Sequence, residues 1–186
     1  MEAALPREHY VDSGSFARER EMLRHEWTCM GRLDDLGLTE PDRVAVVDFC
    51  GESVLVTNDG SLHAHANVCR HRGAQLMSAD APPCGVKALR CPYHSWTYAL
   101  DGSLMHAPHA DDIDTADFHL TSLAADAWGG WLWIAEAPRT SLLEQLGPIP
   151  ERVQRYPLAD LRLGLRFTYD VAANWKVIAE NYNECY

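Results

Sequence analysis

The sequence has little positive charge and no long apolar run, and both absences exclude functions. Lys and Arg number 16 against 27 Asp and Glu in 186 residues, a formal net charge of −11. A phosphate-binding surface needs clustered cations, so we exclude nucleic acid as a partner. An acidic surface suits a cationic substrate or a basic partner protein, but solubility is the simpler interpretation. Because no apolar run approaches the roughly 20 residues of a bilayer span, we expect no membrane segment.

The N-terminal residues and the cysteines point to one compartment. Residues 1–6 lack the basic flank and the apolar stretch of a signal peptide, so we expect a cytoplasmic protein. Thiols stay reduced there. The cysteines are therefore predicted to be metal ligands, nucleophiles or buried apolar residues rather than disulfides. The six are Cys29, Cys50, Cys69, Cys84, Cys91 and Cys185.

The hydrophobic pattern predicts an α+β fold that begins with a helix and a small antiparallel β domain. Residues 1–40 are predicted to be an N-terminal helical segment, in which Ser15 is the expected N-cap of a helix over residues 15–27. Residues 41–138 contain short β-branched runs separated by turn signals such as Asn-Asp-Gly at 58–60. Short strands with tight turns are typical of a small antiparallel β domain.

The rest of the chain is predicted to be a connector followed by the start of a second domain. Residues 139–160 are punctuated by proline and contain a weak helical pattern near 142–146. Within residues 161–186, a strand-like alternation over 165–171 precedes Asn174, the expected N-cap of a final helix. One strand and one helix cannot bury their own apolar face. We therefore expect the chain to stop inside a larger fold.

Two cysteines and two histidines occur as two closely spaced pairs in the predicted β domain. Cys69 and His71 form a C-x-H pair, and Cys91 and His94 form a C-x2-H pair. Short spacing on a turn lets both side chains of a pair converge on one metal centre. Zinc takes the same four ligands, but Cys2His2 zinc fingers group like residues on each loop. Mixed loops suit a Rieske 2Fe-2S cluster, in which one iron takes both cysteines and the other both histidines. We favour this cluster and keep zinc as the alternative.

At these motifs the sequence resembles the large (α) subunit of Rieske non-haem iron oxygenases, and the resemblance covers most of the chain. The segments that carry it are Cys69-Arg70-His71-Arg72-Gly73, Cys91-Pro92-Tyr93-His94-Ser95-Trp96-Thr97-Tyr98, Ala66-Asn67, Trp128-Gly129-Gly130-Trp131-Leu132-Trp133 and Asn174-Trp175-Lys176. Two features depart from the family pattern. The 19 residues between His71 and Cys91 are slightly more than is usual, and Ser95 stands where many members have Gly.

The resemblance implies that the paired cysteines and histidines hold a Rieske 2Fe-2S cluster. Two imidazoles in place of two thiolates make such a cluster less negative and raise its potential, so that it accepts electrons from a ferredoxin or flavin reductase. Tyr98 is a candidate hydrogen-bond donor to a ligand sulfur. Arg70 and Arg72 either offset the cluster charge or are solvated loop cations.

The acidic residues of the predicted final helix have two interpretations. Glu180 and Glu184 lie four apart, and from the sequence alone a solvated acidic face is favoured. The resemblance instead implies that Glu184 is the carboxylate that bridges the cluster of one subunit to the mononuclear iron of its neighbour. Most members have Asp at this position. Glu is similar to the branch that oxidises quaternary ammonium compounds such as glycine betaine and carnitine.

The resemblance implies an enzyme, a mono- or dioxygenase that uses O2 to hydroxylate an aromatic ring or to oxidise an N-methyl group. The expected first histidine of the mononuclear iron site follows Tyr186, and every histidine of the chain lies at or before His119. We therefore expect mononuclear non-haem Fe(II) only in a full-length enzyme, a homotrimer that acts on a small molecule, and no oxygenase activity in this chain alone. The alternative is a stand-alone Rieske ferredoxin-like electron carrier without catalysis. The segment 165–186 argues against it, because such a carrier has no need for an incomplete strand and helix.

The other cysteines and histidines receive less specific interpretations. His63 and His65 alternate on a predicted strand, which places them on one face, and we interpret them as polar surface histidines. His106 and His109 are assigned no role. The cysteines without a ligand-spaced partner, which we interpret as ordinary thiols, are Cys29, Cys50, Cys84 and Cys185.

Overall fold

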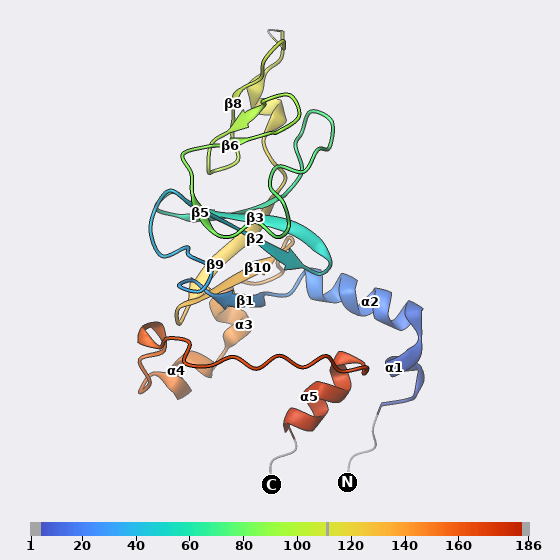
Figure 1. The fold of residues 1–186 in the computed structure, drawn as a ribbon. Coiled ribbons are helices and arrows are strands. Elements are labelled where there is room, and N and C mark those ends of the chain that lie inside the picture. Colours follow the sequence, from blue (N-terminus) through green and yellow to red (C-terminus); the bar gives the residue numbers. More distant parts are fainter. Residues whose placement is uncertain (1–4, 111, 184–186) are drawn as a thin grey trace.

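A computed structural model describes residues 5–110 and 112–183 of the protein. The fold is built on a seven-stranded sheet (Figure 1). The strands follow the order β1-β10-β9-β4-β3-β2-β5 across this sheet. Their bounds are β1 Thr28–Arg32, β2 Arg43–Phe49, β3 Glu52–Asn58, β4 Leu62–Ala66, β5 Cys84–Gly85, β9 Ser122–Trp128 and β10 Trp131–Ala135. A second sheet contains β6 Leu89–Arg90, β7 Thr97–Tyr98 and β8 Leu104–His106. All paired strands are antiparallel, which confirms the predicted α+β class with an antiparallel β domain.

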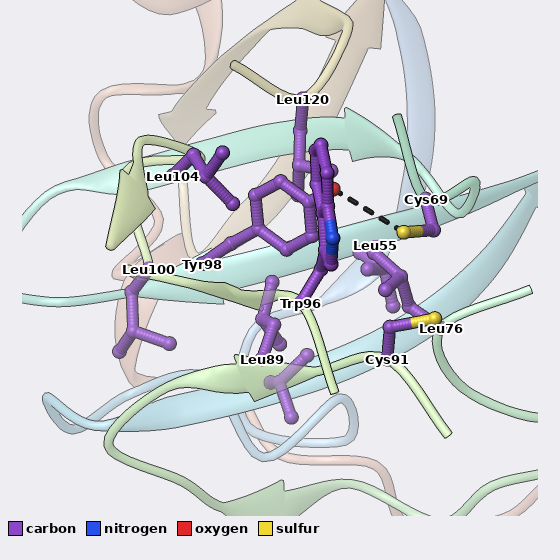
Figure 2. Close-up of a cluster of buried hydrophobic side chains, with 11 residues drawn as sticks. Leu55, Cys69, Leu76, Leu89, Cys91, Trp96, Tyr98, Leu100, Leu104 and Leu120 are labelled. Carbon is purple, nitrogen blue, oxygen red and sulfur yellow. Dashed lines mark hydrogen bonds between the residues drawn. The ribbon is translucent and has the colours of Figure 1, made fainter. Parts of the chain in front are cut away.

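Strand β3 lies between two hydrophobic cores. Val54, Leu55 and Val56 follow one another and are all buried. Since neighbouring side chains of a strand point to opposite faces, both faces of β3 must be covered. Leu55 contributes to a core that also contains Tyr98, whereas Val54 and Val56 contribute to a core around Leu132. The core with Leu55 and Tyr98 also contains the cysteines of the two Cys/His pairs, Cys69 and Cys91, and we call it the cluster-side core (Figure 2).

The N-terminal helix differs from the prediction at both ends. Helix α1 spans Glu8–Val11, and helix α2 spans Ser13–Arg24. Asp12 is the N-cap of α2, because its side-chain oxygen accepts the backbone N–H of Ser15 at 2.7 Å. The prediction of Ser15 as the cap was therefore wrong, and Ser15 is buried inside the helix. The helix ends at Arg24, before Trp27, and the chain then enters β1, which pairs with β10.

Besides α1, one short helix precedes β9, and the other short helices follow β10. Helix α3, Leu142–Leu146, forms where it was predicted, and a capping box of Ser141 and Glu144 begins it. Helix α4 spans Ile149–Val153, and the 3-10 helices η1 and η2 span Thr115–Phe118 and Leu158–Asp160. Among the described residues, no helix has the length and apolar character needed to cross a bilayer.

The last part of the chain is an extended segment and a helix. Helix α5 spans Trp175–Asn183, and the side-chain oxygen of Asn174 accepts the N–H of Lys176 at 3.0 Å, which confirms the predicted cap. Residues 161–171 are extended, but they pair with no strand of the described parts. A strand needs a neighbour to form its ladder, so the strand predicted at 165–171 is not formed here. The apolar side chains that this segment exposes are Leu161, Leu163, Leu165, Phe167, Tyr169 and Val171.

Candidate metal centre

Two loops with the same hydrogen-bond pattern carry the two Cys/His pairs. In each loop the cysteine N–H donates to the carbonyl five residues later, and the cysteine carbonyl accepts the N–H of the fourth residue. These bonds join Cys69 to Ala74 and Gly73 to Cys69 in the first loop, and Cys91 to Trp96 and Ser95 to Cys91 in the second, with distances of 2.8, 3.0, 2.8 and 3.0 Å. Gly73 and Ser95 occupy the left-handed region at φ +70° and +62°. Ser95 thus adopts a left-handed conformation that favours glycine, despite its side chain.

The two cysteine sulfurs lie at one edge of the cluster-side core (Figure 2). Cys69 and Cys91 are each only 2% exposed, and neither forms a disulfide. Burial raises the pKa of the Cys69 thiol, and the neighbouring thiol of Cys91 raises it further. A pair of thiolates in such a position needs a cation to stabilise its charge, which a bound metal supplies.

The two imidazoles lie closer to the surface than the sulfurs. The rings of His71 and His94 are 4.8 Å apart at 70°, and Trp96 stacks on His71 at 4.8 Å and 7°. Burial lowers the pKa of His71, and His94 and Arg72 beside it lower it further. Metal ligation requires the neutral imidazole, so this shift favours the ligand form. His94 is exposed, with the ring of Tyr93 3.8 Å from its own.

Tyr98 connects the second loop to the first. Its side chain is fully buried, and its hydroxyl oxygen lies 3.3 Å from the sulfur of Cys69. The same oxygen accepts the backbone N–H of Arg70 at 3.0 Å, which leaves the hydroxyl proton for the sulfur. Burial raises the pKa of Tyr98, so the hydroxyl keeps this proton. The expectation of Tyr98 as a donor to a ligand sulfur agrees with this geometry.

Asn67 fixes the two ends of the first loop. Its amide nitrogen donates to the hydroxyl of Ser53 at 2.9 Å and to the carbonyl of Met77 at 2.7 Å. Its amide oxygen accepts the N–H groups of Leu76 and Met77 at 3.1 and 3.0 Å. All four hydrogen-bonding positions of the amide are used. Sequence reasoning noted Asn67 only as part of the family pattern and assigned it no role, and its place just before the first pair was the available signal.

The donor set fits a 2Fe-2S cluster better than a single zinc ion. Two sulfurs lie in the core and two imidazoles toward the surface, so the donors divide by type and by depth. Within the described residues, no three His, Cys, Asp or Glu side chains converge as ligands of one ion. A Rieske cluster needs only two protein ligands at each iron, which matches this division.

The structure also tests the interpretations of other histidines and cysteines. His63 and His65 stack at 6.2 Å on one face of β4, as expected. The interpretation of His65 as a surface residue was wrong, because it is 1% exposed and its Nε2 lies 3.1 Å from the Leu100 carbonyl oxygen. Cys29, Cys50 and Cys84 are free thiols. Glu184 and Cys185 lie outside the described residues.

Comparison with known proteins gives two family matches. Residues 26–119 match the Rieske [2Fe-2S] domain, and residues 158–186 match the catalytic domain of the ring hydroxylating alpha subunit. The chain is 34% identical over 98% of its length to the carnitine monooxygenase oxygenase subunit of Acinetobacter baumannii. It is 31% identical over 98% of its length to the glycine betaine monooxygenase oxygenase subunit of Chromohalobacter salexigens. It covers 50% and 42% of these proteins, so it spans about half of their length.

Solved structures agree with these matches. The quaternary ammonium Rieske monooxygenase CntA in complex with L-carnitine superposes with a TM-score of 0.85 at 32% identity, over 97% of this chain and 53% of that one. Naphthalene 1,2-dioxygenase with bound indole superposes with a TM-score of 0.63 at 22% identity, over 73% of this chain and 32% of that one. The second likeness concerns the fold alone.

Proposed function

This chain belongs to the α-subunit family of Rieske non-haem iron oxygenases, and we propose that it brings electrons into an oxygenase that oxidises a quaternary ammonium compound with O2. The observation that carries the proposal is the pair of like loops, which bring two buried sulfurs and two imidazoles together. Cys69, His71, Cys91 and His94 are the proposed ligands of the 2Fe-2S cluster that this family contains.

The surrounding residues are proposed to hold and tune these ligands. When bound, the cluster supplies a one-electron relay with a higher potential than all-cysteine clusters have. Tyr98 donates a hydrogen bond to the Cys69 sulfur, which stabilises the thiolate. Asn67 fixes the ends of the first loop, and Trp96 keeps the His71 ring in one orientation. The exposed edge of His94 leaves the centre accessible to an electron donor or a neighbouring subunit.

The electron path beyond the loops is proposed from the family. Glu184 is the proposed bridging carboxylate, and it follows helix α5 directly in the chain. A ferredoxin or flavin reductase is the proposed donor, and a homotrimer is the proposed assembly of the full-length enzyme. The family uses a mononuclear iron in the catalytic domain, which residues 158–186 match in part. We propose that its ligands belong to the half of the relatives that this chain does not span.

The proposed substrate class rests on the relatives. Proteins named for oxidation of carnitine and of glycine betaine are 34% and 31% identical to this chain. Both named substrates carry a quaternary ammonium group, so N-methyl oxidation is better supported than hydroxylation of an aromatic ring. The match of residues 158–186 to a catalytic domain supports an oxygenase over a stand-alone electron carrier.

Metal analysis tests the proposed ligands. We expect the chain, reconstituted anaerobically with iron and sulfide, to contain the two irons and two sulfides of one cluster and to give a Rieske-type EPR signal after reduction. Cys91→Ser should abolish the signal, whereas the matched control Cys29→Ser, at an exposed free thiol, should keep it. An EPR-silent protein that binds zinc instead would contradict the proposal.

A further inference from the structure

Helix α5 lies near the N-terminal helices (Figure 1), and polar side chains join it to them. Each carboxylate oxygen of Glu19, on α2, accepts a hydrogen bond from Lys176 Nζ at 2.7 Å. The indole N–H of Trp175 donates to the same carboxylate at 3.2 Å. On α1, the carbonyl of Tyr10 accepts the side-chain N–H of Asn174 at 3.1 Å. The cap and the first turn of α5 are thus bound to helices from the other end of the chain.

Glu19 and Lys176 form an ion pair that is shielded from water. Their side chains are 15% and 10% exposed. The Lys176 ammonium also lies 5.2 Å from the ring centre of Trp175 and 5.8 Å from that of Tyr10. The hydrogen bond from Lys176 lowers the pKa of Glu19, so the carboxylate stays charged. Removal of one partner would leave the other charge shielded and unpaired, which is strongly unfavourable.

Apolar packing holds this end of α5 only weakly. An open cavity of about 340 Å³ lies between α2 and the start of α5, and Phe16, Leu23, Cys50 and Trp175 are among its lining residues. Other apolar side chains of the helix are exposed: they are Val177, Ile178 and Tyr182. The direction of α5 therefore depends on the polar contacts.

The N-terminal helices, α1 and α2, lie outside both family matches. These matches therefore do not account for the contact of the two helices with α5. We propose that Glu19 is a positioning residue, which holds Lys176 and Trp175 and so fixes the direction of α5, the helix that Glu184 follows in the chain. This inference rests on the proposed function, because the direction of α5 matters for electron transfer only if the carboxylate of Glu184 lies on the electron path.

Charge reversal in the reconstituted full chain tests the inference. The variants are Glu19→Lys, Lys176→Glu and the double variant, and the readout is hydrogen exchange of the backbone amides of α5 and β3, measured by mass spectrometry. We expect each single variant to increase the exchange rate of α5 at least tenfold, while β3 keeps its rate. The double variant should return the exchange rate of α5 to that of the unaltered chain. Glu52→Lys is the matched control, because Glu52 pairs with Arg24 of the same helix α2 and should leave α5 unchanged.

Three outcomes would overturn the role of Glu19. The first is an unchanged exchange rate of α5 in both single variants, and the second is an equal increase of the exchange rates of α5 and β3. The third is a double variant in which α5 exchanges as fast as in the single variants. The EPR signal of the cluster is measured on the same samples and is expected in all of them. Its absence from the unaltered chain would refute the proposed function while leaving the exchange result to decide on Glu19.

Discussion

The hydroxyl oxygen of Tyr98 lies 3.3 Å from the sulfur of Cys69, at the edge of the cluster-side core. The proton of this hydroxyl is directed to the sulfur, since the oxygen already accepts a backbone N–H. Hydrogen bonds to ligand sulfurs are one of the factors that set the potential of an iron–sulfur centre. Such a bond offsets negative charge and therefore favours the reduced form, which carries one more electron.

Tyr98→Phe is expected to lower the reduction potential by about 40 mV. This value converts a hydrogen bond of about 1 kcal/mol at 59 mV per tenfold change for one electron. An EPR-monitored redox titration measures it. Tyr93→Phe is the control, because it removes a hydroxyl from a residue that is 65% exposed and keeps the ring beside His94. It should leave the potential unchanged. Equal potentials for Tyr98→Phe and the unaltered protein would refute the role of the hydroxyl.

His94→Cys is expected to lower the potential by a few hundred millivolts, the interval between Rieske centres and all-cysteine ferredoxins. The reason is that a thiolate brings a negative charge where the imidazole was neutral. Protein-film voltammetry checks the change. His106→Cys is the comparison, since His106 was assigned no role and lies on β8. A potential unaffected by His94→Cys would show that His94 is not a ligand.

Gly102→Ala is expected to destabilise the fold by more than 2 kcal/mol. Gly102 has φ +87°, and a Cβ there would lie 2.6 Å from Cε1 of the buried His65. The left-handed backbone costs an alanine roughly 1 kcal/mol, and displacement of the packed ring adds about 1–3 kcal/mol. Urea unfolding gives the difference. Gly73→Ala, with φ +70° and nothing within 4 Å of its Cβ, should lose only the backbone contribution. Equal losses of stability in the two variants would contradict the prediction, because they would mean that the His65 ring is displaced without cost.

Stability is expected to fall in mild acid because of His65. Burial lowers the pKa of this histidine below its ordinary value of 6.5. Between the two values the unfolded chain binds a proton that the folded chain does not, so stability falls with decreasing pH by up to about 1.4 kcal/mol per unit. Urea midpoints at pH 7.5 and about 5.5 measure the loss. Between these two pH values, the His65→Gln variant should lose less stability than the His63→Gln variant. The same loss of stability in both variants would contradict the prediction.

The sequence predicted the features that depend on local spacing. The two Cys/His pairs are close in the chain, and the structure places their four side chains at two like loops. The Asn174 cap and helix α3 likewise depend on neighbouring residues, and both formed where they were predicted. Alternation in β4 placed His63 and His65 on one face correctly.

Features that depend on distant partners could not be predicted. Alternation does not reveal what covers a face, and the carbonyl of Leu100 that lies against His65 belongs to a loop far along the chain. The two-residue strands β5 and β6 exist only through their pairing with β2 and β7. The contact of Glu19 with Lys176 joins opposite ends of the chain, and no local pattern marks it.

The most direct test of paired ligation is nitrogen ENDOR spectroscopy of the reduced protein, with ¹⁵N-labelled histidine. If His71 and His94 both bind one iron, two histidine couplings are predicted, and one should disappear in His94→Cys. A reduced cluster without any histidine coupling would contradict the ligation by Cys69, His71, Cys91 and His94.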